Sequence, residues 1–330
     1  MPGRKNTQQL TIDGREVPVS NLDKVLYPES GFTKAHVIDY YIRVSPYLLP
    51  HFKSRPVTLK RYPDGVSGQS FYEKERAKFA PAWIRTFPVP RRAGGSDINY
   101  ILIDDLATLV WCANAASLEL HPFLHCAPAI ERPTSVVFDL DPGEGADLLR
   151  CAEIALHLRK LFSSLYLECF PKVSGSKGIQ LYVPLNTPVT YAVTQPFARA
   201  IADFAANEQP DLIIAEMKKS ERKNKVFIDW SQNSDFKTTV GVYSLRAKRS
   251  RPFVSSPVTW KELETAVRSR KSDTLYFEPE AALKRLETVG DLFAPVLTMK
   301  QRLPKRIEAA LASGSSQPDR RRVPRVRKRE

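Results

Sequence analysis

The most constraining feature of this sequence is an apolar segment that ends in two acidic residues. Residues 135–141 read Ser-Val-Val-Phe-Asp-Leu-Asp, and a Pro-Gly pair follows them. Such an apolar run predicts a buried β-strand. Residues i and i+2 of a strand point to the same face about 6.6 Å apart, so Asp139 and Asp141 are expected to project together. Two carboxylates this close repel each other unless a cation lies between them.

Two explanations fit these acids. A pair of Mg²⁺ or Mn²⁺ ions about 3.5–4 Å apart relieves such repulsion in phosphoryl-transfer enzymes. Alternatively, Asp-Pro-Gly is a common exposed turn at the end of a strand. A third acid favours the metal, because the apolar residues 226–228 are again followed by an acid, Asp229. If the two strands are neighbours, three carboxylates converge at one edge, and hard divalent cations prefer such an oxygen cluster.

The segment Ser174-Gly175-Ser176-Lys177-Gly178 lies between the two acidic strands in the chain. Two glycines, two hydroxyls and one lysine can bind an anion through backbone N–H groups and a point charge. The spacing does not match a Walker A loop. In isolation a plain hairpin loop is the simpler explanation, but the position between the acidic strands favours triphosphate binding.

The rest of the chain alternates helical and extended patterns, which favours a mixed α+β or α/β fold. Expected helices cover 33–49, with Thr33 as N-cap, 105–118, 146–164 and 196–207; expected strands cover 56–62, 98–103, 165–171 and 179–184. Residues 1–19 read as a polar lead-in with a turn at Asp13-Gly14, residues 20–300 as the catalytic domain, and residues 301–330 as a basic tail of disordered composition.

The net charge of +14 has two explanations that fit about equally well: a polyanionic partner, of which nucleic acid is the commonest, and a well-solvated surface that is rich in arginine. Half of this charge lies in residues 301–330, which hold ten Lys and Arg against three acids. We expect this tail to add salt-dependent affinity for DNA.

No apolar run is long enough to span a membrane and the N-terminus has no signal-peptide pattern, so we expect a cytoplasmic, nucleoid-associated protein. The four cysteines form no C-x-x-C pair, which excludes the usual zinc-ribbon spacing.

Three ordered motifs together resemble a known family. FDLDPG (138–143), SGSKG (174–178) and FIDWSQN (227–233) are similar to the three motifs of the archaeo-eukaryotic primase superfamily, above all to the polymerase domain of bacterial DNA ligase D. Flanking segments such as RPVTLKRYPDGV (55–66), LELHP (118–122) and TTVGVYSLR (238–246) agree. The resemblance covers roughly residues 18–295 and implies a primase-like core of two β-sheets flanked by helices.

The resemblance also implies roles for individual residues. Asp139, Asp141 and Asp229 resemble carboxylates that hold two Mn²⁺ or Mg²⁺ ions in a template-directed nucleotidyltransferase with a preference for ribonucleotides. The residues that resemble nucleotide contacts are Ser174, Lys177, Gln232 and Arg246 at the triphosphate, and Lys60 and His121 at the sugar and base. The residues that resemble DNA contacts are Phe71 and Tyr72 stacking on the template, Lys24 and Lys34 at a 5′-phosphate, and Arg61 and Arg222 near template and primer.

One position departs from the superfamily pattern. The second motif usually continues S-G-x-K-G-x-His, whereas this chain has Gln180. A glutamine can donate to a phosphate but cannot act as a general acid, so we expect an effect on rate more than on binding. The printed sequence also lacks a K-x-D-G ligase motif, so we expect ligation by another chain.

Three functions follow as hypotheses. The first is a polymerase that works with Ku and a separate ligase in end joining, on DNA that carries a 5′-phosphate and with NTP or dNTP as substrate. The second is a gap-filling or priming polymerase of excision repair or damage tolerance. The third is a DNA-end-binding module that has lost activity, a reading that Gln180 favours.

Overall fold

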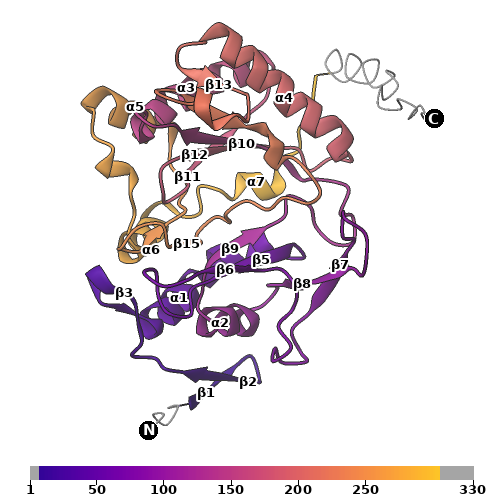
Figure 1. Ribbon diagram of the computed structural model, residues 1–330, viewed down its shortest axis with the longest axis vertical. Coiled ribbons are helices and arrows are strands. Elements are labelled where there is room, and N and C mark those ends of the chain that lie inside the picture. Colours follow the sequence, from indigo (N-terminus) through magenta and orange to yellow (C-terminus); the bar gives the residue numbers. More distant parts are fainter. Residues whose placement is uncertain (1–6, 305–330) are drawn as a thin grey trace, which may run out of the picture.

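The computed structural model describes residues 7–304, which form two lobes that each contain a five-stranded sheet (Figure 1). The lower lobe is built around β5 (Pro56–Arg61), which pairs with β9 (Ser117–Pro122) along one side. Along its other side β5 pairs with β6 (Phe71–Glu73) and β8 (Ile98–Leu102), and β7 (Thr86–Val89) completes this sheet. The mixed α and β composition with two sheets confirms the predicted fold class.

Helices cover the lower sheet on the side away from the upper lobe (Figure 1). Helix α1 (Lys34–Phe52) begins after Thr33, whose hydroxyl accepts a hydrogen bond from the His36 amide as the predicted N-cap. It packs against α2 (Leu106–Asn114), and the two bury an apolar cluster with β5 and β9. Two short strands, β3 (Val25–Tyr27) and β4 (Phe32–Thr33), pair just before α1.

The upper sheet carries the acidic strands. Its strand order is β11-β12-β10-β14-β13, with β10 (Ser135–Pro142) in the centre. The other strands are β11 (Phe170–Val173), β12 (Ile179–Pro184), β13 (Ile213–Ile214) and β14 (Val226–Asp229). Helices α3 (Leu148–Ser164), α4 (Tyr191–Glu208) and α5 (Trp260–Ser269) cover its outer face (Figure 1). The opposite face is therefore left for the space between the lobes.

The C-terminal segment joins the two lobes. It contains β15 (Leu245–Arg246), β16 (Phe253–Val254), α6 (Pro279–Val289) and α7 (Pro295–Thr298). Asp291, after α6, contacts His51 of α1 at 2.8 Å and accepts a hydrogen bond from Tyr243 at 2.5 Å. These buried contacts keep α1 and the C-terminal segment in one arrangement. None of the helices within residues 7–304 combines the length and apolar character needed to cross a membrane.

Several elements differ from the sequence expectation. The helix expected over 105–118 ends at Asn114, because Ala116 takes a left-handed backbone (φ 57°) and residues 117–122 pair with β5 as a strand. Helix α4 begins at Tyr191 and contains Pro196 within it, whereas Pro196 was expected to open it. The strand expected over 165–171 lies at Phe170–Val173. A short apolar run fits both the helical and the strand period, so the strands that pair with it decide which structure it adopts.

The N-terminal segment also contains more structure than a polar lead-in. Strands β1 (Thr7–Ile12) and β2 (Arg15–Ser20) form a hairpin with the predicted turn at Asp13-Gly14. Val17 and Val19 are fully buried beside α2. The predicted basic tail lies outside the described residues from 305 onward.

Candidate active site

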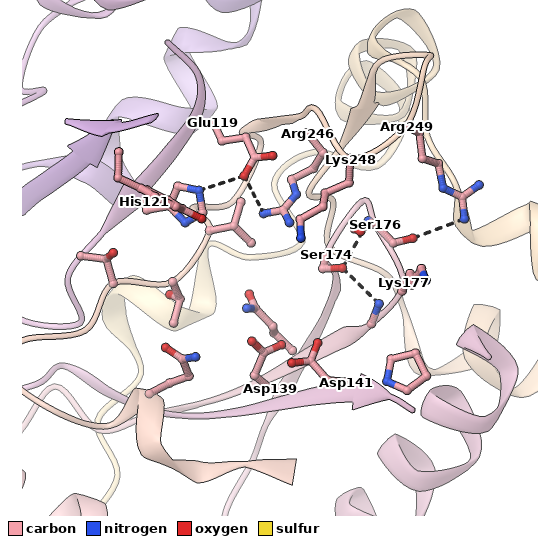
Figure 2. A pocket seen from close by; sticks show the side chains of 18 of the residues that line it. Glu119, His121, Asp139, Asp141, Ser174, Ser176, Lys177, Arg246, Lys248 and Arg249 are labelled. Atoms are coloured by element: carbon pink, nitrogen blue, oxygen red, sulfur yellow. Dashed lines mark hydrogen bonds and ion pairs between the residues drawn. The ribbon is translucent and has the colours of Figure 1, made fainter. Parts of the chain in front are cut away.

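The two sheets face each other across a cavity of about 710 Å³. Strands β6 and β9 of the lower lobe line one wall, and β10, β12 and the β11–β12 loop line the other. Figure 2 shows Glu119 and His121 on one side, Asp139 and Asp141 across from them, and the loop with Ser174 and Lys177 beside the acids. Residues as far apart in the chain as Tyr72 and Arg249 thus line one cavity.

The three aspartates lie on neighbouring strands, as the sequence predicted. Strand β10 pairs with β14 in antiparallel register, and Asp139 is directly opposite Asp229. Burial, together with the negative charges of Asp141 and Asp229, raises the pKa of Asp139 well above its usual range. Burial and Asp229 likewise raise the pKa of Asp141. Negative charge is therefore concentrated at a point where no lysine or arginine forms an ion pair with these three acids in the described part of the chain.

Asp229 differs from the other two because its carboxylate is held by its own turn. It accepts hydrogen bonds from the Ser231 amide at 3.0 Å, from the Ser231 hydroxyl, and from Gln232 Nε2 at 2.9 Å. Within residues 7–304, no three acidic, histidine or cysteine side chains are gathered closely enough to enclose a metal ion. Carboxylate oxygens are the donors that Mn²⁺ and Mg²⁺ prefer. The three aspartates are adjacent in the sheet without forming a closed set of ligands.

The β11–β12 loop is a compact turn that faces the acids. Ser174 Oγ accepts hydrogen bonds from the amides of Ser176 and Gly178, both at 3.2 Å, and keeps its own hydrogen free to donate. A Cβ at Gly178 would lie 2.3 Å from the Leu140 carbonyl oxygen, so only glycine allows this loop to approach β10. Lys177 lines the cavity beside this turn. The structure thus brings Ser174 and Lys177 to the acids.

Glu119 is a cavity residue that the sequence analysis missed. It is buried on β9, and its carboxylate contacts His121 Nε2 at 3.0 Å and Arg246 Nη1 at 3.4 Å. Although burial opposes ionisation, the hydrogen bond from His121 and the charge of Arg246 hold the pKa of Glu119 well below its usual range. Glu119 therefore positions two predicted nucleotide-binding residues (Figure 2). The sequence signal was the i, i+2 spacing of Glu119 and His121 in Leu-Glu-Leu-His. On a strand this spacing places both side chains on the same face.

A second missed residue lies beneath the acids. Lys172 of β11 is fully buried, and burial lowers its pKa to about 7. Its ammonium donates to Gln180 Oε1 at 2.7 Å, Ser255 Oγ at 2.6 Å and the Val240 carbonyl at 3.2 Å. Gln180 in turn forms a side-chain hydrogen bond with Asp139. The glutamine that departs from the superfamily motif is thus oriented by a lysine on one side and contacts an acid on the other.

The comparisons with known proteins agree with this architecture. The family model described as "LigD, primase-polymerase domain" matches residues 33–293. The chain belongs to this family. The multifunctional non-homologous end joining protein LigD of Mycolicibacterium smegmatis is 42% identical over 283 residues, which are 85% of this chain and 36% of that protein. The bifunctional LigD of Bacillus subtilis is 36% identical over 250 residues, 75% of this chain and 39% of that protein.

A solved structure has the same fold. The polymerase domain of Mycobacterium tuberculosis ligase D, in complex with DNA, matches with a TM-score of 0.78 and 38% identity. The match covers 86% of this chain and 98% of that domain. The chain spans little more than a third of the length of the curated LigD relatives that it matches. It therefore corresponds to the primase-polymerase part of those longer proteins.

Within this LigD primase-polymerase domain, the predicted residues Tyr72 and His121 line the cavity, whereas Lys60 and Phe71 lie beside Tyr72 and outside that lining. Tyr72 lines the cavity, 57% exposed, with its ring edge-on to His121 at 5.8 Å. Lys60 Nζ lies 5.2 Å from the ring centroid of Tyr72, and burial lowers its pKa. Phe71 is 45% exposed and precedes Tyr72 on β6. Gln232 and Arg246 also line the cavity, so the structure brings together most of the predicted nucleotide contacts.

Three of the predicted DNA contacts, Lys24, Lys34 and Arg61, form a basic cluster on the lower lobe of the LigD domain. Lys34 is buried and donates to the Ser20 carbonyl at 2.9 Å, and burial followed by the charges of Lys24 and Arg61 lowers its pKa. Lys24 forms an exposed ion pair with Asp64 at 2.9 Å. These three cations therefore lie near one another, as a phosphate site requires.

The two predicted arginines are more constrained than expected. Arg61 is mostly buried, donating to Glu73 at 2.9 Å and to the Ala115 carbonyl at 2.8 Å. Arg222 lines the cavity of the LigD domain, where its guanidinium lies 3.6 Å from the ring centroid of Phe227. The guanidinium of Arg61 is thus engaged inside the protein, whereas Arg222 reaches the cavity.

Proposed function

We propose that this chain is a template-directed nucleotidyltransferase that extends 3′ ends of DNA during non-homologous end joining. One observation carries the proposal: Asp139 and Asp141 and a lysine-bearing anion loop face one cavity that also contains Arg246, and Asp229 lies opposite Asp139 on the paired strand. Membership of the LigD primase-polymerase family supports it, as does the similarity to LigD proteins of non-homologous end joining. The DNA bound to the solved ligase D domain supports DNA as substrate.

In this proposal the nucleoside triphosphate lies in the cavity with its phosphates toward the β11–β12 loop. Lys177, Arg246 and the Ser174 hydroxyl would hold the β and γ phosphates, and Gln232 would lie beside them. The 3′-hydroxyl of the primer attacks the α-phosphorus in line, a new P–O bond forms, and pyrophosphate leaves. Mn²⁺ or Mg²⁺ bound by Asp139, Asp141 and Asp229 would supply positive charge at the attacking and leaving oxygens.

The lower lobe would hold the sugar, the base and the DNA. We propose that Lys60 and His121 contact the sugar, with a preference for ribonucleotides, and that Phe71 and Tyr72 stack on the template. Lys24 and Lys34 would bind a 5′-phosphate across a gap, while Arg61 supports the template face and Arg222 lies near the primer. The proposed partners of this chain are Ku and a separate DNA ligase, and the proposed location is the nucleoid.

The test is nucleotide incorporation on three DNA substrates. We expect Mn²⁺-dependent extension on a 5′-phosphorylated gap and on paired overhanging ends, and far less on an unprimed template. Asp139→Ala should abolish extension while DNA affinity is unchanged, and Asp211→Ala, an exposed acid before β13, should extend normally. Undiminished extension by Asp139→Ala would refute the assignment of the acids. Extension on gaps but not on paired ends would place the chain in gap repair instead.

A further inference from the structure

Phe79 presents an aromatic ring to solvent beside the template residues. It lies in the loop between β6 and β7, and 66% of its surface is exposed. A single exposed hydrophobic residue is common on protein surfaces and needs no explanation alone. The surroundings of this ring, however, hold it in place and connect it to the cavity.

The loop that carries Phe79 is fixed by hydrogen bonds. Arg76 donates to the carbonyl of Ala80 at 2.7 Å and to that of Pro81 at 2.8 Å, on the residues that directly follow Phe79. Trp111 of α2 is buried and supports the ring from below, with 5.8 Å between the ring centroids. One side of the Phe79 ring is therefore supported and much of the rest remains open, which is the arrangement of a preformed stacking surface.

Phe79 also continues the row of template residues. The guanidinium carbon of Arg61 lies 5.4 Å from the ring centroid of Phe71 and 5.5 Å from that of Phe79. Because Glu73 and the Ala115 carbonyl hold Arg61, this arginine is a rigid spacer between the two rings. Phe71, Arg61 and Phe79 thus form a row on one face of the edge strand β6, and Tyr72, the next residue of that strand, points to the cavity on the other face.

The charge beside this row identifies the partner. Lys24 and Lys34 lie near Arg61, so cations accompany the exposed rings. Exposed rings combined with a positive groove are how proteins bind single-stranded nucleic acid, because the rings stack on bases and the cations follow the backbone. We infer that Phe79 is a third base-stacking platform, which takes an unpaired template base beyond those at Phe71 and Tyr72. This inference rests on the proposed function, since it needs a template that leaves the cavity past Tyr72.

The experiment measures DNA affinity without nucleotide or metal, so that it does not depend on catalysis. Fluorescence anisotropy would compare primer–template DNA that carries short and long unpaired template overhangs. We expect Phe79→Ala to weaken binding of long overhangs about 5- to 150-fold, the range for loss of one base–aromatic stack. Short overhangs should bind equally well to both proteins. The salt dependence of binding should not change, because a phenyl ring displaces no counterions.

Three further variants separate stacking from other causes. Phe79→Tyr keeps an aromatic ring and should bind like the wild type, whereas Phe79→Leu keeps apolar surface without a ring and should lose affinity. Tyr166→Ala, a 95% exposed aromatic after α3 in the upper lobe, should have no effect. Equal affinity of Phe79→Ala and wild type for long overhangs would overturn the inference, as would full binding by Phe79→Leu. Absence of extension by the wild type would refute the proposed function instead.

Discussion

Replacing Asp139 with asparagine should stabilise the metal-free protein while it abolishes extension. Asp139 lies opposite Asp229 and two residues from Asp141 on the same strand. Two unit charges about 6 Å apart at an effective dielectric constant near 20 repel by about 3 kcal/mol. The hydrogen bond from Gln180 and the charge of Lys172 offset part of the repulsion from the two acids. We therefore expect a net gain of about 3 kcal/mol when this charge is removed.

The gain should depend on pH in a definite direction. The pKa of Asp139 is raised in the folded protein, so the folded state binds more protons than the unfolded state between the two pKa values. The stability of the wild type therefore falls as pH rises from about 4 through the folded pKa. Asp139→Asn lacks this loss. The difference in unfolding free energy between the variant and the wild type should therefore be largest above neutral pH and smallest in acid.

Thermal unfolding in EDTA is the assay. For a chain of this size, about 3 kcal/mol corresponds to a rise in Tm of roughly 6 °C. Asp147→Asn is the matched control, because it removes a charge from the same lobe yet preserves the N-cap of α3, where Asp147 accepts from the Arg150 amide at 2.9 Å. Adding Mn²⁺ should raise the Tm of the wild type and of the control, but not that of Asp139→Asn. A lower Tm for Asp139→Asn in EDTA, or an equal response to Mn²⁺, would refute the reasoning.

Three further predictions concern residues around the acids. The stability of the wild type should rise between about pH 7 and 10.5, because Lys172 has a pKa of about 7 in the folded protein and binds a proton again on unfolding. Lys172→Met should lack this rise. Urea unfolding that gives both proteins the same dependence of unfolding free energy on pH would contradict this prediction. Glu119→Gln should lower kcat/KM for the nucleotide about 10- to 100-fold, because Arg246 and His121 lose a charged partner; steady-state kinetics unchanged from wild type would count against this role. Gln180→His should raise kcat about tenfold with little change in KM, because an imidazole can transfer protons where an amide cannot; a rise in KM alone would show that Gln180 acts in binding.

Much of the site was predictable because its signals are local. An apolar strand must be buried, and acids at alternate positions that continue it point to one face, whatever surrounds them. The same reasoning placed Asp229 correctly, and β10 and β14 do pair. Glu119 was missed because an Ala-rich apolar run suited a helix, whereas pairing with β5 made residues 117–122 a strand. The left-handed backbone at Ala116, which ends the helical region, had no signature in the sequence.

The sequence by itself determined the acidic strand ends, the glycine-rich loop, the mixed fold class and the family, because each depends on short-range spacing and residue type. Only the tertiary structure decided how these parts meet. It buried Lys172 under Gln180, engaged Arg61 between two aromatic rings, and bound the carboxylate of Asp229 into its own turn. The physical reason is that burial and hydrogen-bond partners come from strands and loops distant in the chain, and these determine which charged groups face the cavity.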